Sequence, residues 1–329
     1  MSEKCAVILA AGHGSKMRSD KPKALEKVLF RPMIDRVLQA VKEAGIEKIC
    51  VVTGYRSDLI REHLGDSVEY ALQDQPTGTG GAVAAALPFI EKTGAENVFI
   101  VNADTPFIDE MTVTDALEAL DETSSSVTII SAVLDDPLGY GRVVRDIYDQ
   151  LIKVVEQRDA DDKERSIKEV NSGAYWFRAA DLAYAVSKLT QHDDGGNPPE
   201  KTGYYISDAV EILMQNGKKA FPVMTDNINF VRKAHDRIQL NDLNDIARRE
   251  VIRHQLVSGV EIPCTDGVII ADDVTIGAGT VIYPNTIIKD GSVIGCNCEI
   301  GPNCFITGSD IKDFVKLDNV KCEDSIIEQ

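Results

Sequence analysis

Apolar residues in the first 230 positions follow two alternating patterns. Short runs that are apolar at every position are typical of strands buried on both faces, and stretches with apolar residues at helical spacing separate them. Strands are expected at 5–10, 49–53, 97–101, 127–133 and 173–177. Helices are expected at 32–44, 79–90 and 112–120. This alternation predicts an α/β domain over residues 1–230, in which helices cover both faces of a Rossmann-like parallel sheet with right-handed crossovers.

The pattern changes after residue 230. Residues 231–257 read as one long amphipathic helix, whose apolar positions include Leu240, Leu243 and Ile246. The sequence on its C-terminal side has a different period from the sequence on its N-terminal side. We therefore assign residues 231–258 to a linker helix between two domains.

Residues 259–329 have a period of six. Isoleucine falls on one register seven times, at Ile270, Ile276, Ile282, Ile288, Ile294, Ile300 and Ile306. A β meander alternates with period two and would not keep this interval. The spacing predicts a short, truncated left-handed parallel β-helix of hexapeptide repeats, in which each isoleucine stacks on the one a coil below. Beyond Ile306 we expect the register to slip by two residues and to resume at Phe314, Val320 and Ile326.

Charge and cysteine content narrow the possible partners and the compartment. The 329 residues include 35 Lys and Arg against 53 Asp and Glu, a net charge of −18. This charge argues against binding nucleic acid or an anionic membrane by bulk electrostatics, although a few local donors suffice for a phosphorylated small molecule. Seven cysteines without a CxxC pair are typical of reduced thiols in a cytoplasmic protein. No apolar run is long enough to cross a bilayer.

The first strand leads into a glycine turn, LAAGHGSKM at 9–17. Gly12 and Gly14 allow backbone N–H groups to approach phosphate oxygens at the carboxyl edge of the sheet. The turn lacks the third glycine of a dinucleotide fingerprint and the GK[ST] of a Walker loop. SDKPK at 19–23 follows, and its Lys23 is well placed to neutralise a triphosphate. A plain βα turn and a solvated basic loop are the structural alternatives for these two segments.

Two further segments carry candidate ligands. LQDQPTGTGG at 72–81 places an amide, Gln73, before a glycine-rich helix start, which suits the edge of a pyrimidine base. The strand at 97–101 leads to NADTP at 102–106, and a carboxylate such as Asp104 at a strand tip is a typical Mg²⁺ ligand in phosphoryl chemistry. The structural alternatives are Thr79 as a helix cap and Asp104 as a turn cap before Pro106.

Taken together, these segments resemble the nucleotide-sugar pyrophosphorylase family. Four more segments, DDPLGYGR at 135–142, VEQRDA at 155–160, EVNSG at 169–173 and YYISD at 204–208, extend the resemblance. They are similar in order and spacing to the N-terminal domain of bacterial bifunctional N-acetylglucosamine-1-phosphate uridyltransferase/glucosamine-1-phosphate acetyltransferases. The similarity runs from about residue 5 through the linker helix into the β-helix.

The resemblance implies a role for each matching residue. Lys16 and Lys23 would be the catalytic cations that bind the triphosphate. UTP would contact Leu9, Ala10, Ala11, Gly12, Gly14, Gln73, Gly78, Thr79 and Ala103. The N-acetylglucosamine moiety would contact Gly139, Glu156, Asn171 and Tyr205. The cofactor would be Mg²⁺, held by Asp104 and by the residue at position 235.

Four positions depart from the family pattern. Lys16 replaces an arginine fork with a point charge, and Ala103 replaces a glycine before the metal ligand. Gly203 replaces a glutamate, and the loop at 192–201 is lengthened. His235, in KAHDR at 233–237, stands where the second metal ligand is an asparagine. Imidazole matches Mg²⁺ less well than an amide oxygen, so Asp236 is an alternative ligand and a surface helix histidine is the structural alternative.

The implied activity is Mg²⁺-dependent UDP-N-acetylglucosamine diphosphorylase, which converts UTP and N-acetylglucosamine 1-phosphate to UDP-N-acetylglucosamine and pyrophosphate. The acetyltransferase activity is expected to be absent, because the sequence ends before the later coils of a longer β-helix. The uncapped last coil is either covered by a neighbouring subunit or is the cut end of a longer ancestral solenoid, and we expect a homotrimer assembled through the β-helix. Alternatives are a related nucleotidyltransferase for another sugar or nucleotide, and a non-catalytic paralogue that binds a nucleotide sugar.

Overall fold

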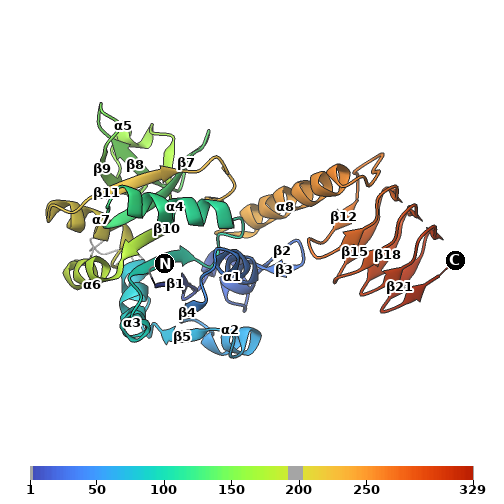
Figure 1. The fold of residues 1–329 in the computed structure, drawn as a ribbon, viewed down its shortest axis with the longest axis horizontal. Helices are drawn as coiled ribbons and strands as arrows, with labels where there is room; N and C mark the ends of the chain where they lie inside the picture. Colours follow the sequence, from blue (N-terminus) through green and yellow to red (C-terminus); the bar gives the residue numbers. More distant parts are fainter. Residues whose placement is uncertain (1–2, 192–202, 329) are drawn as a thin grey trace. The chain divides into compact units, whose positions relative to one another are not determined.

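The computed structural model describes residues 3–191 and 203–328, which fold into two units (Figure 1). The first unit comprises Met1–Glu26 and Pro32–Arg237 and the second comprises Lys27–Arg31 and Ile238–Gln329. The segment 27–31 belongs to the second unit because Phe30 packs against its isoleucine core. The loop expected to be lengthened, 192–201, lies outside the described residues.

A nine-stranded sheet forms the centre of the first unit. Its main path runs in the order β11-β7-β10-β6-β1-β4-β5. These strands are β1 (Lys4–Leu9), β4 (Lys48–Thr53), β5 (Glu69–Leu72), β6 (Asn97–Asn102), β7 (Val127–Val133), β10 (Glu169–Arg178) and β11 (Ala220–Met224). The short β8 (Gly141–Arg145) and β9 (Leu151–Val155) extend the sheet from β10. The expected strands at 5–10, 49–53, 97–101, 127–133 and 173–177 are therefore all present.

The sheet is mixed, which corrects the expectation of a parallel one. Strand β10 runs antiparallel to both of its neighbours, β6 and β7. Its Val170 and its Ala174–Phe177 segment are buried, so its hydrophobic pattern is the same as that of a buried parallel strand. Burial on both faces is visible in the sequence, but strand direction is not.

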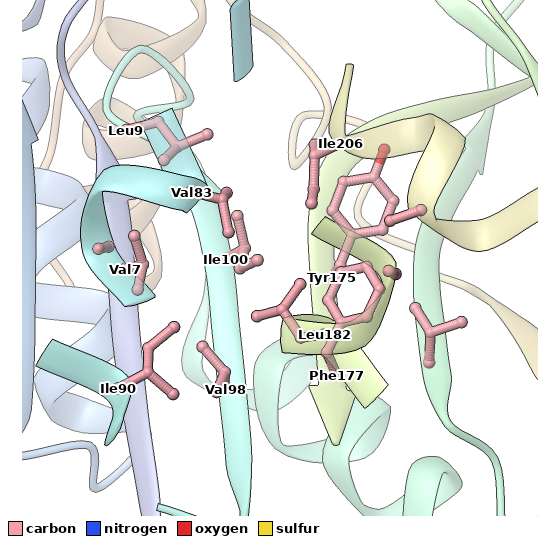
Figure 2. Packing of buried hydrophobic residues seen from close by; sticks show 14 of the residues in the cluster. Val7, Leu9, Val83, Ile90, Val98, Ile100, Tyr175, Phe177, Leu182 and Ile206 are labelled. Carbon is pink, nitrogen blue, oxygen red and sulfur yellow. The ribbon is translucent and has the colours of Figure 1, made fainter. Parts of the chain in front are cut away.

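Helices cover both faces of this sheet. Val7 and Leu9 of β1 pack with α3 (Gly78–Thr93), α6 (Ala179–Lys188) and α7 (Ile206–Gln215) on one face. Figure 2 shows this cluster, with Val7 and Leu9 of β1 beside Val83 of α3. Ala6 and Ile8 point to the other face, where α1 (Met33–Glu43), α2 (Ser57–Leu64) and α4 (Glu110–Glu122) pack. The alternation of β1 residues between two cores explains why the run at 5–10 is apolar throughout.

The linker helix is shorter than expected. Helix α8 spans Arg237–Val257, so residues 231–236 lie outside it. Val231 is instead buried with Ala132, Leu134 and Val170, and Tyr140 packs against this group. This packing holds the segment 231–236 against the first unit. His235 therefore lies in a bend just before α8 and not on a helix surface.

Short parallel strands build a left-handed β-helix in the second unit. They form three sheets, β12-β15-β18-β21, β13-β16-β19-β22 and β14-β17-β20. The bounds are β12 (Ile269–Ile270), β13 (Thr275–Ile276), β14 (Val281–Ile282), β15 (Ile287–Lys289), β16 (Val293–Ile294), β17 (Glu299–Ile300), β18 (Phe305–Thr307), β19 (Asp310–Ile311), β20 (Lys316–Leu317), β21 (Lys321–Glu323) and β22 (Ile326–Ile327). All seven isoleucines of the predicted ladder are buried.

The continuation of the ladder differs from the prediction. Ile306 is followed by Ile311, which pairs with Ile294 of the preceding coil. The turn between β18 and β19 is one residue shorter than the turn between β15 and β16, so the next inward position comes after five residues. The ladder then continues through Leu317, Cys322 and Ile327. Phe314 and Ile326, two of the expected inward positions, are 57% and 68% exposed, and Val320 is partly buried.

Candidate functional site

Four strands of the first unit end at the same edge of the sheet. Leu9 at the end of β1 is paired with Asn102 of β6 and Val52 of β4. The loops continue in contact, because Ala103 N–H donates to the Leu9 carbonyl at 3.0 Å and Ala10 N–H donates to the Val52 carbonyl at 2.9 Å. The residues that follow β1, β4, β5 and β6 are thus brought together at the carboxyl edge, where α/β sheets bind ligands.

A cavity of about 850 Å³ opens at this edge. It is lined by all nine residues expected to contact the nucleotide, Leu9, Ala10, Ala11, Gly12, Gly14, Gln73, Gly78, Thr79 and Ala103. Asp104 and Lys23 also contribute to its wall. The cavity is large enough for a ligand of nucleotide size.

The glycine turn supplies backbone to one wall of the cavity. Gly14 has a φ of +64°, and a Cβ at this position would lie 2.9 Å from Cβ of Lys23. A glycine is therefore needed both for the left-handed backbone and for the close approach of Lys23. Lys16 follows on a short 3-10 helix, η1 (Ser15–Met17), where it is exposed and does not line the cavity.

Gln73 and Thr79 are both held by hydrogen bonds within the protein. Gln73 Nε2 donates to the Gly78 carbonyl at 3.0 Å and to Thr77 Oγ1 at 3.2 Å, which fixes the side-chain amide at the start of α3. Thr79 lies inside α3, and its Oγ1 accepts from Ile206 N–H at 3.0 Å. Thr79 therefore anchors the start of α7 and does not cap α3.

The cationic centre of the site lies around Asp104. The Lys23 ammonium forms a salt bridge with Oδ2 of Asp104, and both side chains are mostly buried. Lys23 Nζ also lies 3.2 Å from Nδ1 of His235. An ammonium group has only donors, so Nδ1 accepts and a neutral His235 ring carries its proton on Nε2. The structure thus brings together three residues that are far apart in the sequence.

Electrostatics fix the charge states at this centre. Burial alone would raise the pKa of Asp104, but the Lys23 and Lys233 ammonium groups outweigh it and hold this pKa below its ordinary value. Burial, reinforced by the charges of Lys23 and Lys233, lowers the pKa of His235 to about 4. At neutral pH the centre therefore presents a carboxylate, two lysines and a neutral imidazole.

The donors at this centre fit a divalent cation that arrives with its substrate. Within residues 3–191 and 203–328, no group of three or more His, Cys, Asp or Glu side chains is arranged to hold a metal. Mg²⁺ in phosphoryl-transfer sites is bound by one or two carboxylates, with water and substrate phosphate completing the octahedron. Asp104 meets that requirement. His235 offers only an imidazole nitrogen that already accepts from Lys23.

The residues expected to contact the sugar form a second group that does not line the cavity, apart from Tyr205. Glu156 Oε1 accepts from Ser207 Oγ at 2.8 Å, and Gly139 N–H donates to Gln157 Oε1 at 3.2 Å. Asn171 Nδ2 donates to the Tyr175 hydroxyl at 2.6 Å.

Gly141 lies between two residues of this second group. A Cβ added to Gly141 would lie 3.6 Å from both Glu156 Oε2 and Asn171 Cβ, so these two side chains flank it. Tyr205, on the cavity wall, stacks under the Arg158 guanidinium at 4.4 Å and links the cavity to the loop that carries Glu156.

One departure from the family pattern has a steric explanation. A Cβ added to Gly203 would lie 3.1 Å from the carbonyl carbon and oxygen of Thr77. Tyr204 N–H donates to the same carbonyl oxygen at 2.8 Å, which keeps the two segments in contact. A glutamate at 203 would force the backbone away from the start of α3, so glycine suits this packing.

Three residues of the cavity or of the centre around Asp104 were not predicted from the sequence. Tyr55 and His13 line the cavity, and their rings are in edge contact at 4.0 Å. Lys233 lies beside the Tyr140 ring, 5.0 Å from its centroid. The sequence places Lys233 two residues before His235, but it gives no sign that the Lys233 side chain is partly buried.

Two other sequence expectations can be compared with the structure. All seven cysteines are free of disulfide bonds, and only Cys264 and Cys296 are exposed. Across the described part of the chain, no helix has the length and apolar character that a bilayer span requires.

Comparison with known proteins gives two family models. The MobA-like NTP transferase domain matches residues 6–171, and the bacterial transferase hexapeptide, a unit of six repeats, matches residues 267–302. These segments coincide with the sheet that carries the cavity and with the early isoleucine ladder.

Curated relatives match most of the chain. The chain is 38% identical over 281 residues to the bifunctional protein GlmU of Acetivibrio thermocellus, covering 85% of this chain and 59% of that protein. It is 33% identical over 320 residues to the bifunctional protein GlmU of Clostridioides difficile, covering 97% of this chain and 68% of that protein. The chain therefore spans 59% of the length of the first of these relatives and 68% of the length of the second.

Among solved structures, the chain is similar to one described as a candidate glucose-1-phosphate thymidylyltransferase from Bacillus anthracis, in complex with a sucrose. The TM-score is 0.61 at 20% sequence identity, and the match covers 74% of this chain and 95% of the other. This similarity supports the fold.

Proposed function

Because the chain belongs to the GlmU family, with a MobA-like nucleotidyltransferase domain followed by hexapeptide repeats, we propose that it joins UTP and N-acetylglucosamine 1-phosphate. The products would be UDP-N-acetylglucosamine and pyrophosphate. The observation that carries the proposal is the Lys23–Asp104 pair on the wall of a nucleotide-sized cavity at the carboxyl edge of the sheet.

The cavity would hold the nucleotide. Space is open around Gly12, where an added Cβ would meet nothing within 4 Å, so backbone N–H groups of the turn at 9–14 would approach the phosphates and ribose. Gln73 is fixed by Thr77 and Gly78, so its amide would present one orientation to a base edge. A pre-oriented amide favours one hydrogen-bonding pattern, which supports selection of uracil.

The reaction joins two polyanions. An oxygen of the sugar phosphate attacks the α-phosphorus of UTP in line, its bond to that phosphorus forms, and the bond to the pyrophosphate oxygen breaks. The nucleophile is already ionised, so no general base is required. Lys23, with Lys16 at the exposed side, would offset the repulsion and stabilise charge that develops in the transition state.

Nucleotidyltransferases of this type use a divalent metal, and we propose Mg²⁺ with Asp104 as its protein carboxylate. When bound, Mg²⁺ supplies positive charge to the phosphate oxygens. Asp104 would hold the ion, and Lys23, which forms a salt bridge with Asp104 in this structure, would bind phosphate beside it. His235 would remain a neutral neighbour that orients Lys23.

The second group of residues would bind the sugar. Glu156 and Asn171 flank Gly141, and their oxygen and nitrogen atoms are suitable partners for hydroxyl and acetamido groups. Gly139, with a φ of +87°, turns the loop beside them. Tyr205 would separate this sugar side from the nucleotide cavity, whose wall it forms.

The role of the β-helix is a separate proposal. Residues 259–329 contain no histidine, so the coils of this chain lack the usual general base for acetyl transfer, and we propose that they do not transfer acetyl groups. We propose instead a homotrimer assembled through the β-helix in the cytoplasm. A mass of one protomer in sedimentation equilibrium would contradict the trimer. Release of coenzyme A from acetyl-CoA in the presence of glucosamine 1-phosphate would contradict the proposed absence of acetyl transfer.

A substrate panel tests the proposed reaction. Pyrophosphate release is measured with UTP, CTP, GTP and dTTP against N-acetylglucosamine 1-phosphate and glucose 1-phosphate, in Mg²⁺. We expect kcat/KM to be highest for UTP with N-acetylglucosamine 1-phosphate. A higher value for another pair would identify a related nucleotidyltransferase, and binding without turnover for every pair would identify a non-catalytic paralogue.

A further inference from the structure

Lys233 lies between the Lys23–Asp104 centre and the loop that carries Gly139 and Gly141. It lies on the segment 231–236, which Val231 fastens to the sheet by burial against Ala132, Leu134 and Val170. Tyr140 packs against the same group and lies under the Lys233 ammonium, 5.0 Å from the ring centroid. Lys233 is thus held above the loop that carries Gly139 and Gly141.

The two halves of the site each carry a carboxylate. Asp104, at the tip of β6, stands at the phosphate end, and Glu156 stands at the sugar end beside Gly141. The segment of Lys233 reaches both ends, because His235, two residues along the chain, lies 3.2 Å from Lys23 Nζ, and the Tyr140 ring under the Lys233 ammonium belongs to the loop that carries Gly139 and Gly141.

Neither carboxylate neutralises Lys233 directly. Asp104 is already paired with Lys23, and Glu156 accepts from Ser207. In the parts of the chain that the structure describes, Lys233 has no salt bridge, and its close contact is the face of Tyr140. A mostly buried ammonium without an ion-pair partner is costly in an otherwise stable domain, so it is typical of a site that receives an anion.

We propose that Lys233 binds the phosphate of the sugar 1-phosphate substrate. This inference rests on the proposed function. The phosphate of a sugar 1-phosphate carries close to two negative charges at neutral pH, and its sugar and its attacking oxygen must point in opposite directions. An ammonium that lies between the Glu156 side and the Asp104 side meets both requirements, and the Tyr140 face restricts where the ammonium can move.

The test compares Lys233→Gln with the wild-type enzyme and with Lys92→Gln. Lys92 is an exposed lysine of α3 that pairs with Glu69 at 2.8 Å and lies outside both halves of the site. Michaelis constants are measured separately for UTP and for N-acetylglucosamine 1-phosphate from pyrophosphate release. Binding of N-acetylglucosamine 1-phosphate alone is measured by calorimetry on the same three proteins.

We expect Lys233→Gln to raise the KM and the calorimetric Kd for the sugar phosphate by about 10-fold to 100-fold, the range for one charge-assisted hydrogen bond. The KM for UTP should stay within about twofold. Lys233→Arg should recover part of the loss, because it restores the charge with a different shape. Lys92→Gln should behave as wild type.

The outcomes separate this inference from the proposed function. Turnover by the wild type with an unchanged sugar-phosphate KM in Lys233→Gln would overturn the role of Lys233 alone. A rise confined to the KM for UTP would assign Lys233 to the nucleotide and would also overturn it. Absence of wild-type turnover, with sugar-phosphate binding that still depends on Lys233, would overturn the proposed reaction and leave the binding role standing.

Discussion

The corrected register of the β-helix makes a quantitative prediction. The structure places Ile311 in the core at 0% exposure and leaves Phe314 57% exposed, whereas a two-residue slip would place Phe314 inside. Ile311→Ala and Phe314→Ala therefore form a matched pair of truncations three residues apart. The pair reports directly on which residue continues the isoleucine ladder.

The expected losses of stability in the two variants differ enough to show which residue lies in the core. Truncation of a fully buried isoleucine to alanine costs about 2–5 kcal/mol, because apolar contacts are lost and a cavity remains. Truncation of a side chain that is more than half exposed costs about 1 kcal/mol or less. In a unit of about 100 residues, 1 kcal/mol shifts Tm by about 4–8 °C. We expect Ile311→Ala to lower the Tm of the second unit by about 8–40 °C and Phe314→Ala by a few degrees.

The assay must distinguish the two units. The chain has one tryptophan, Trp176, which is buried in the first unit, so tryptophan fluorescence follows that unit and serves as an internal control. Calorimetry and far-ultraviolet circular dichroism, at one fixed protein concentration, follow the β-helix as well. A larger loss from Phe314→Ala than from Ile311→Ala would refute the register described above.

Three other predictions follow from the first unit and the thiols. Lys23→Gln should reduce kcat for pyrophosphate release by about 100-fold or more, because it removes a cation from the reacting phosphates; a rate within threefold of wild type would contradict its role. His235→Asn should lower the Mg²⁺ concentration for half-maximal activity, because an amide oxygen at position 235 would join Asp104 as a ligand where the neutral imidazole only orients Lys23, and an unchanged or higher value would show that position 235 does not reach the ion. A thiol reagent under native conditions should modify two cysteines, Cys264 and Cys296, and all seven after denaturation in urea, as counted by mass spectrometry; more than two in the native protein would contradict the burial described.

Much of the fold is encoded in patterns that a sequence displays directly. Strands β1, β4 and β6 are apolar at every interior position because each side of the sheet is covered by helices. The isoleucine ladder is equally plain as far as Ile306, since the isoleucines recur every six residues. The pattern fails where geometry depends on partners far away in the sequence, as in the antiparallel direction of β10 and the shortened turn after β18.

The candidate site was predictable where it depends on single strand ends. Asp104, Lys23 and the glycine turn lie on the expected edge, because parallel strands deliver their carboxyl ends to one place. Lys233 was not predictable, because its neighbourhood depends on how Val231 packs and on where Tyr140 lies. A lysine in a polar sequence segment gives no sign that its ammonium is buried.

The central claim is that the edge occupied by Lys23 and Asp104 is a centre of phosphoryl transfer. The most direct measurement is pyrophosphate release from UTP and N-acetylglucosamine 1-phosphate in Mg²⁺ by wild type and by Asp104→Asn, which keeps the shape and removes the charge. We predict turnover by the wild type and a fall in kcat of at least about 100-fold in the variant. Equal rates for the two proteins would contradict the claim.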